Sequence, residues 1–111
     1  MAYDEELAAR IRELVTDEPG LAEQRMFGGL AFLIHGNMAV GASSGGGMLL
    51  RVPPEQTEEL AGRPHAHKFV MRGREMDGWL RVDGAGVVSE DDLEQWVSLG
   101  VAHARTLPEK R

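Results

Sequence analysis

The chain has 111 residues, a hydrophobic content of 42%, a charged content of 27% and a net charge of -6, which fits one globular domain and excludes a disordered or fibrous chain. It contains no cysteine, so disulfides, thiolate zinc sites and thiol nucleophiles are excluded. Its longest apolar run, residues 26–34, is too short to span a bilayer, and its acidic start lacks the features of a signal peptide, so we expect a cytoplasmic protein without membrane contact.

The first predicted element is a helix over residues 4–17. Asp4 can accept hydrogen bonds from the free amides at the helix start, and the acidic residues that follow it suit the helix dipole. Pro19 and Gly20 then end the helix. One face of the helix is apolar, because four residues recur at helical spacing: Leu7, Ile11, Leu14 and Val15.

A strand, a bend and a second strand are predicted for the apolar run. Residues 26–34 are too many for one average strand, and two adjacent glycines interrupt them. Glycine inside a strand often marks a bulge or a close backbone approach. We therefore expect a bend at Gly28 and Gly29, followed by a second strand over residues 30–35.

Two further strands flank a glycine-rich loop. A two-residue turn at residues 36–37 (Gly-Asn) leads into a strand over 38–42, because both residues tolerate positive φ. A flexible loop over 43–47 then leads into a strand over 48–52. In that strand, alternation places Arg51 on the face opposite to three apolar residues, Met48, Leu50 and Val52.

The next predicted elements are a short helix and a hairpin. The helix starts at the two prolines of residues 53–54, because proline is tolerated in a first turn, and it ends at Gly62. Strands over 67–71 and 79–82 follow, with a turn within residues 72–78.

The last predicted element is a long helix that Ser89 caps, with Asp92 three residues later. Residues 1–107 are expected to form one domain, and residues 108–111 a tail. The buried stripe of this helix consists of Leu93, Trp96, Val97, Gly100, Val101 and Ala104.

The predicted order is α-β-β-β-β-α-β-β-α. An antiparallel meander sheet with helices packed on one face is the natural architecture for this order, so the predicted class is α+β. The predicted sheet segments are net positive and the predicted helices net negative. Such asymmetry can steer partners, or the helices can simply expose acidic faces to water.

The segment Arg25, Met26, Phe27, Gly28 and Gly29 opens the predicted sheet. It resembles the signature that opens the sheet in the TfoX/Sxy family of competence regulators. We expect the glycines to bend the chain so that the Met-Phe pair enters the core beneath the first helix, which leaves the arginine as an exposed contact. Further points of resemblance are Leu30, Phe32, Met38, Val40 and the strands at 49–52 and 79–82.

The resemblance covers most of the chain and is closest to a stand-alone TfoX N-terminal domain. It implies a role in regulating competence and transcription through contact with a transcription factor of the cyclic-AMP receptor type. The full-length regulators carry a second, helical C-terminal domain, which we do not expect here.

No catalytic, cofactor or metal site is predicted. The glycines at 45–47 lack the lysine and the following helix of a phosphate-binding loop. His65 and His67 would share one face of a strand but lack a third ligand, and the acidic cluster at 90–92 fits a helix start. We therefore predict that the chain is not an enzyme. An enzyme whose site assembles from distant residues is the alternative.

An arginine-rich surface near a tryptophan is the candidate interaction site. Arg72, Arg74 and Arg81 lie close to Trp79 in the sequence, and Arg25 is a separate charged candidate. Arginine and tryptophan are enriched in protein-binding hot spots. They also suit single-stranded nucleic acid, although a pI of about 5.1 argues against a dedicated nucleic-acid binder. Free strand edges make a homodimer a further possibility.

Overall fold

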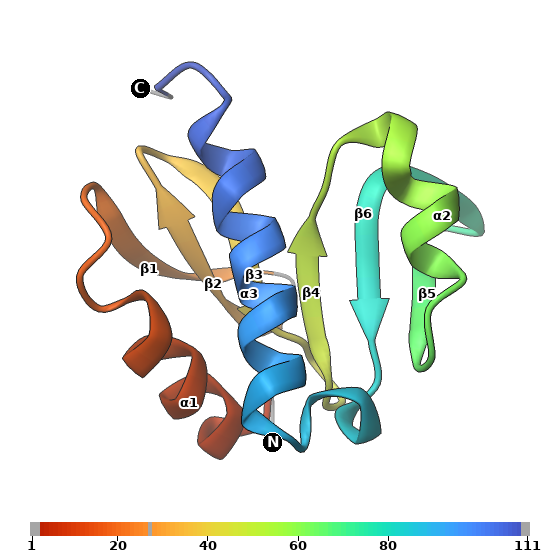
Figure 1. Ribbon diagram of the computed structural model, residues 1–111, viewed down its shortest axis with the longest axis horizontal. Helices are drawn as coiled ribbons and strands as arrows, with labels where there is room; N and C mark the ends of the chain where they lie inside the picture. The colour runs from red at the N-terminus through yellow and green to blue at the C-terminus, as the bar shows by residue number, and fades with distance from the viewer. Residues whose placement is uncertain (1–2, 27, 110–111) are drawn as a thin grey trace.

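Six strands form one antiparallel sheet in the computed structural model, which describes residues 3–26 and 28–109 (Figure 1). The elements are α1 (Glu5–Val15), β1 (Leu21–Met26), β2 (Gly29–Ile34), β3 (Asn37–Ala42), β4 (Met48–Arg51), α2 (Thr57–Ala61), β5 (Ala66–Met71), β6 (Arg74–Val82) and α3 (Glu90–Arg105), with short 3-10 helices at Pro54–Gln56 and Gly84–Val87.

The strand order in the sheet is β1-β2-β3-β4-β6-β5. The first four strands form a meander, and the chain then passes through α2 to the far edge strand β5 before β6 returns beside β4. This arrangement confirms the predicted α+β class and the predicted order of elements.

The three helices pack on one face of the sheet. In Figure 1, α1 and α3 lie in front of the sheet, with α3 over β3 and β4. Their apolar stripes and the inward side chains of the strands form one cluster, which we call the helix-side core. Its fully excluded side chains include Ile11, Phe32, Val40, Met48, Leu50, Val52, Leu80, Val82 and Leu93.

Local sequence signals account for both long helices. The Asp4 carboxylate accepts hydrogen bonds from the amides of Glu6 (3.0 Å) and Leu7 (3.1 Å), and Ser89 Oγ accepts one from the amide of Asp92 (3.0 Å). All six residues of the stripe predicted for α3 are buried, which confirms that prediction. These caps satisfy backbone donors that helix geometry leaves free.

The middle of α3 lies unusually close to β3. A Cβ at Gly100 would stand 2.4 Å from the carbonyl oxygen of Ala39. Only glycine therefore lets the two backbones approach this closely.

The first strand and its turn differ from the sequence prediction. β1 begins at Leu21, five residues before the predicted start. Most of its side chains are exposed on both faces, so this edge strand has no apolar periodicity to reveal it. The glycine bend is present: Gly28 has φ +76, and a Cβ at Gly29 would stand 2.2 Å from the carbonyl oxygen of Ala42.

The prediction that Met26 enters the core beneath α1 is wrong. Met26 packs against the cluster on the opposite face of the sheet, in register with Gly29. Alternation explains this position, because its neighbour Arg25 is in register with Leu30 of the helix-side core. Phe27, the other residue of that prediction, lies outside the described residues.

One turn is shifted from its predicted position, and another lies within its predicted range. The β2–β3 turn consists of His35 (φ 50) and Gly36 (φ 84) instead of Gly36 and Asn37. Asn37 belongs to β3, where its buried side-chain amide donates to the carbonyl of Pro108 (2.8 Å). The β5–β6 turn is the pair Arg72-Gly73, also at positive φ. Both pairs match the left-handed backbone that two-residue hairpin turns require.

Replacing Gly29 with alanine is expected to destabilise the protein by about 1 kcal/mol or more, because the new Cβ would collide with the backbone of β3. Chemical denaturation measures the change in the free energy of unfolding. Gly84→Ala is the control, because a Cβ there meets no atom within 4 Å. Equal stability of the two variants would contradict this account of the signature.

Candidate functional site

The second face of the sheet carries its own apolar cluster, and no helix formed by the described residues covers it. Ala31, Met38 and Leu49 are buried there beneath larger, partly buried side chains. No residue of α1, α2 or α3 belongs to this cluster. We call this surface the open face and define it by Met26, Ala31, Leu33, Met38, Leu49, Phe69 and Trp79.

Strand register adds polar and sulfur-containing side chains to the open face. Leu49 is in register with Arg81, and Arg51 with Trp79, so both arginines share the face of the cluster. On the outer hairpin, Phe69 pairs with Met76, and the next pair on the same face is Met71 with Arg74. The open face is therefore apolar at its centre and bears three arginines, at positions 51, 74 and 81.

Arg51 and Trp79 form a cation–π pair on β4 and β6. The guanidinium carbon of Arg51 lies 5.4 Å from the centroid of the Trp79 ring. Such stacking fixes the indole in one orientation while leaving part of it exposed. The tryptophan is thus partly buried on β6, next to the edge strand β5, on the face that the described helices leave uncovered.

Arg81 braces the loop between β3 and β4. Its guanidinium donates to Ser43 Oγ (2.8 Å) and to the carbonyl of Gly46 (2.9 Å). The amide of Gly46 also donates to the carbonyl of Ser43 (3.1 Å). The sequence predicted a flexible loop at 43–47 and gave no sign that a distant arginine would bind it.

Arg81→Ala is expected to cost about 1–2 kcal/mol of stability, since two charge-assisted hydrogen bonds are lost. Hydrogen exchange at the amides of Ser43 and Gly46 should accelerate with it. Arg72→Ala is the control, because that side chain lies at an exposed turn. Unchanged exchange in the Arg81 variant would show that the loop is ordered by its own backbone.

The open-face arginines differ from several bases on the helix side. Within residues 3–26 and 28–109, Arg51, Arg74 and Arg81 form no ion pair with a carboxylate. On the helix side, bases are paired with acids: Arg10 with Glu90, Arg12 with Glu23, Lys68 with Glu58 and Arg105 with Glu18. The charge of Arg81 acts on the nearby carboxylate of Asp83, so the uncompensated positive charge of the open face lies on Arg51 and Arg74.

The structure brings together only part of the predicted interaction site. Trp79, Arg74 and Arg81 share the open face, and Arg72 lies exposed at the tip of the same hairpin. Arg25 lies on β1, at the other edge of the sheet and on the helix side. The signature arginine is therefore separate from the others.

Sequence reasoning missed most of the open face. The sequence did indicate the position of Arg51, because the alternation of the strand at 48–52 placed it on the face opposite the core residues. Leu49 shares that parity and therefore lies on the same face as Arg51. Nothing in the sequence indicated that three residues from separate strands, Phe69, Met38 and Met26, would lie on the same face of the sheet.

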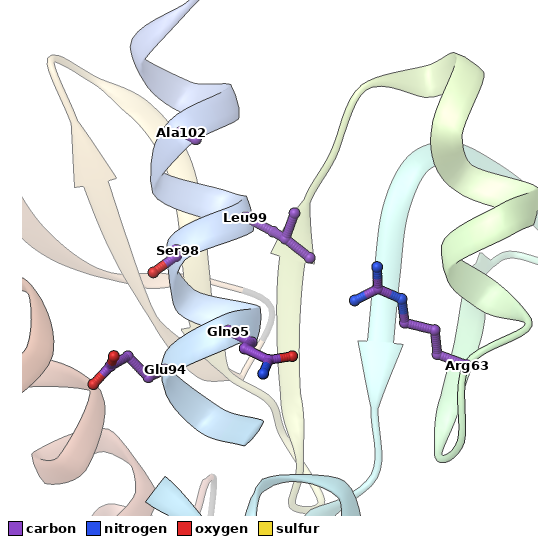
Figure 2. A pocket seen from close by; sticks show the side chains of 6 residues that line it. All are labelled: Arg63, Glu94, Gln95, Ser98, Leu99 and Ala102. Atoms are coloured by element: carbon purple, nitrogen blue, oxygen red, sulfur yellow. The ribbon is translucent and has the colours of Figure 1, made fainter. Parts of the chain in front are cut away.

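A groove on the helix side is the other candidate site. It has a volume of about 340 Å³ and lies between α3 and Arg63, two residues after the end of α2. Figure 2 shows Arg63 reaching across it toward α3, where Gln95 and Leu99 face it. Arg63 also lies over the ring of Trp96, 5.6 Å from its centroid. With one carboxylate, Glu94, and no histidine in its lining, the groove has no general acid–base pair.

The predicted histidine pair does not form on a strand. His65 lies in a turn with φ 66, before β5 begins. His67 Nε2 lies 2.7 Å from Asp83 Oδ2, and this hydrogen bond lowers the pKa of the Asp83 carboxyl. Within the described residues, no three histidine or carboxylate side chains are grouped to hold a metal ion.

His103 of α3 lies at a second groove, of about 430 Å³, beside the two prolines of residues 53–54. Burial, and then the charge of Arg51, lower its pKa from 6.5, while Glu55 acts in the opposite direction. The folded state thus disfavours the protonated ring. The unfolded state binds more protons below pH 6.5, so this histidine makes stability fall as the pH drops through the range beneath that value.

His103→Gln is expected to reduce the loss of stability on acidification, because the group whose pKa differs between folded and unfolded states is removed. Thermal unfolding of both proteins just above and about one unit below pH 6.5 measures the difference. The same decrease in both proteins would assign the acid sensitivity to other groups.

The model of the TfoX N-terminal domain family matches residues 13–104. The chain belongs to the TfoX N-terminal domain family. The matched span includes all six strands and nearly all of α3, so the open face is part of the TfoX domain. Neither the curated proteins nor the solved structures include a significant match to the chain. Within the described part of this TfoX domain, no helix is long and apolar enough to cross a membrane.

Proposed function

We propose that this TfoX N-terminal domain is a regulatory module that binds a protein partner through the open face of its sheet. The observation that carries the proposal is the partly exposed apolar cluster around Trp79, which no helix covers and which arginines border. The process is competence or transcription regulation, and the first partner to test is a transcription factor of the cyclic-AMP receptor type.

The chemistry of the open face supports protein contact. Tryptophan and arginine are the side chains most enriched among residues that dominate binding energy. A contiguous apolar patch with a polar rim is the usual form of a protein interface core. The proposal assigns no catalytic step to the domain, and the helix-side groove supplies no acid–base pair for one.

Single-stranded nucleic acid is the second candidate, because Trp79 and Phe69 lie on a sheet face beside Arg51. Bases stack on aromatic side chains in many single-strand binders. The net charge of -6 disfavours this candidate, since it repels the continuous phosphate backbone of a nucleic acid at long range.

The test is titration calorimetry of the purified protein with a cyclic-AMP receptor type factor from the same source, and a pull-down from the native extract for other partners. Trp79→Ala is expected to weaken binding at least about tenfold, as loss of a hot-spot anchor does. Arg25→Glu is the control, because it lies on the helix side at the opposite edge.

Circular dichroism must first show that each variant is folded. Partner binding that survives Trp79→Ala and a paired Arg51→Glu, Arg74→Glu change would remove the open face from the mechanism. Binding of a single-stranded oligonucleotide that falls steeply with salt would favour the second candidate instead.

A further inference from the structure

We infer that the open face binds an acidic amphipathic helix of the partner protein. The inference rests on the proposed function and specifies its partner. Three features of the described residues carry it: the missing helix layer, the sulfur-rich composition of the face and its uncompensated arginines.

The missing layer indicates a helix. Helices or a second sheet normally cover an apolar sheet face, and here α1 and α3 do so on one side only. The helices that cover the other side are themselves acidic with one apolar stripe, as their buried residues and first turns show. A partner helix of the same kind would complete the second side.

The sheet edges fit an added strand less well. Glu23 and Arg25 place charges on the edge strand β1, and a register shift between Lys68 and Phe69 interrupts the edge strand β5. Charges and bulges at edges discourage pairing with another strand. Docking on the face is therefore favoured over extension of the sheet.

Methionine side chains make up a large part of the open face. Met26 and Met38 belong to its cluster, and strand register places Met71 and Met76 on the same side. Met48 lies instead in the helix-side core. Unbranched thioether side chains adapt to varied apolar partners, and methionine-rich surfaces commonly receive amphipathic helices.

The charge of the face specifies an acidic helix. Arg51 and Arg74 have no carboxylate partner among the described residues, whereas Arg81 interacts with Asp83 and binds the 43–47 loop. Acids flanking an apolar stripe would complement the two free arginines. A second copy of the chain meeting face to face would bring the same arginines together. Like charges across an interface are unfavourable, which disfavours that dimer.

The size of the face sets the length of the helix. The cluster includes a residue from each of the six strands, and strands spaced by about 4.8 Å span about 24 Å. A helix rises about 1.5 Å per residue, so about 16 residues cover this distance. Such a helix presents apolar side chains at i, i+3, i+4 and i+7 over about four turns.

The experiment uses the full chain with its methionine methyl groups labelled by carbon-13. The probe is an amphipathic peptide of about 18 residues, in which leucines form one face and glutamates the other. A peptide with lysine at each glutamate position and a scrambled acidic peptide are the controls. Methyl signals of Met26, Met38, Met71 and Met76 should shift with the acidic amphipathic peptide, while that of Met48 should not.

Charge dependence provides the second measurement. Arg51→Glu combined with Arg74→Glu should weaken the acidic peptide at least about tenfold, and added salt should weaken it in the unchanged protein. Arg25→Glu should leave the affinity unchanged, since this single charge reversal lies on the helix side, and Arg51→Glu alone, with the same change of charge, is its matched comparison.

Three results would overturn the inference. The first is binding of the basic or scrambled peptide that equals or exceeds binding of the acidic peptide. The second is a methyl shift at Met48 without shifts on the open face. The third is displacement of the acidic peptide from the open-face methyl groups by an oligonucleotide or by self-association of the protein. If Trp79→Ala still abolishes binding of the natural partner in any of these cases, the proposed function stands and only the acidic helix falls. If binding of the natural partner also survives Trp79→Ala, both the proposed function and the acidic helix are overturned.

Discussion

The two-residue period of the β-strand determines which side chains enter the helix-side core and which lie on the open face. Along β4 it sends Met48 and Leu50 to the helices and Leu49 and Arg51 to the opposite side. Because the helices cover one side only, every strand with apolar residues at both parities must leave some of them on the uncovered side. The candidate site is thus a direct result of how the sheet is built.

The sequence was sufficient for elements whose own residues define them. The caps and stripe of α3, and the parity of the strand at 48–52, were predicted because each signal lies within one segment. β1 was predicted short, since an edge strand exposed on both faces has no periodicity. The loop at 43–47 and the open face depend on Arg81 and Phe69, whose partners are far away in the sequence, so no local pattern could show them.

Membership in the TfoX N-terminal domain family and the geometry of the sheet describe different levels of function. The family match covers the fold and suggests a small regulatory domain. The cation–π pair of Arg51 and Trp79 lies where we propose that the partner contact forms. The glycines at 28 and 29 belong to the first level, since one bends the chain and the other lets β2 approach β3.

The insertion of β6 between β4 and β5 has a consequence for how the chain folds. The strands β1 to β4 meet by short turns, and β5 meets β6 through a two-residue turn. The pairing of Met48 with Val82 instead joins residues far apart in the sequence. Closing such a long loop costs entropy before the contacts form, so we expect the pairing of β4 with β6 to form after the four-stranded meander and the β5–β6 hairpin.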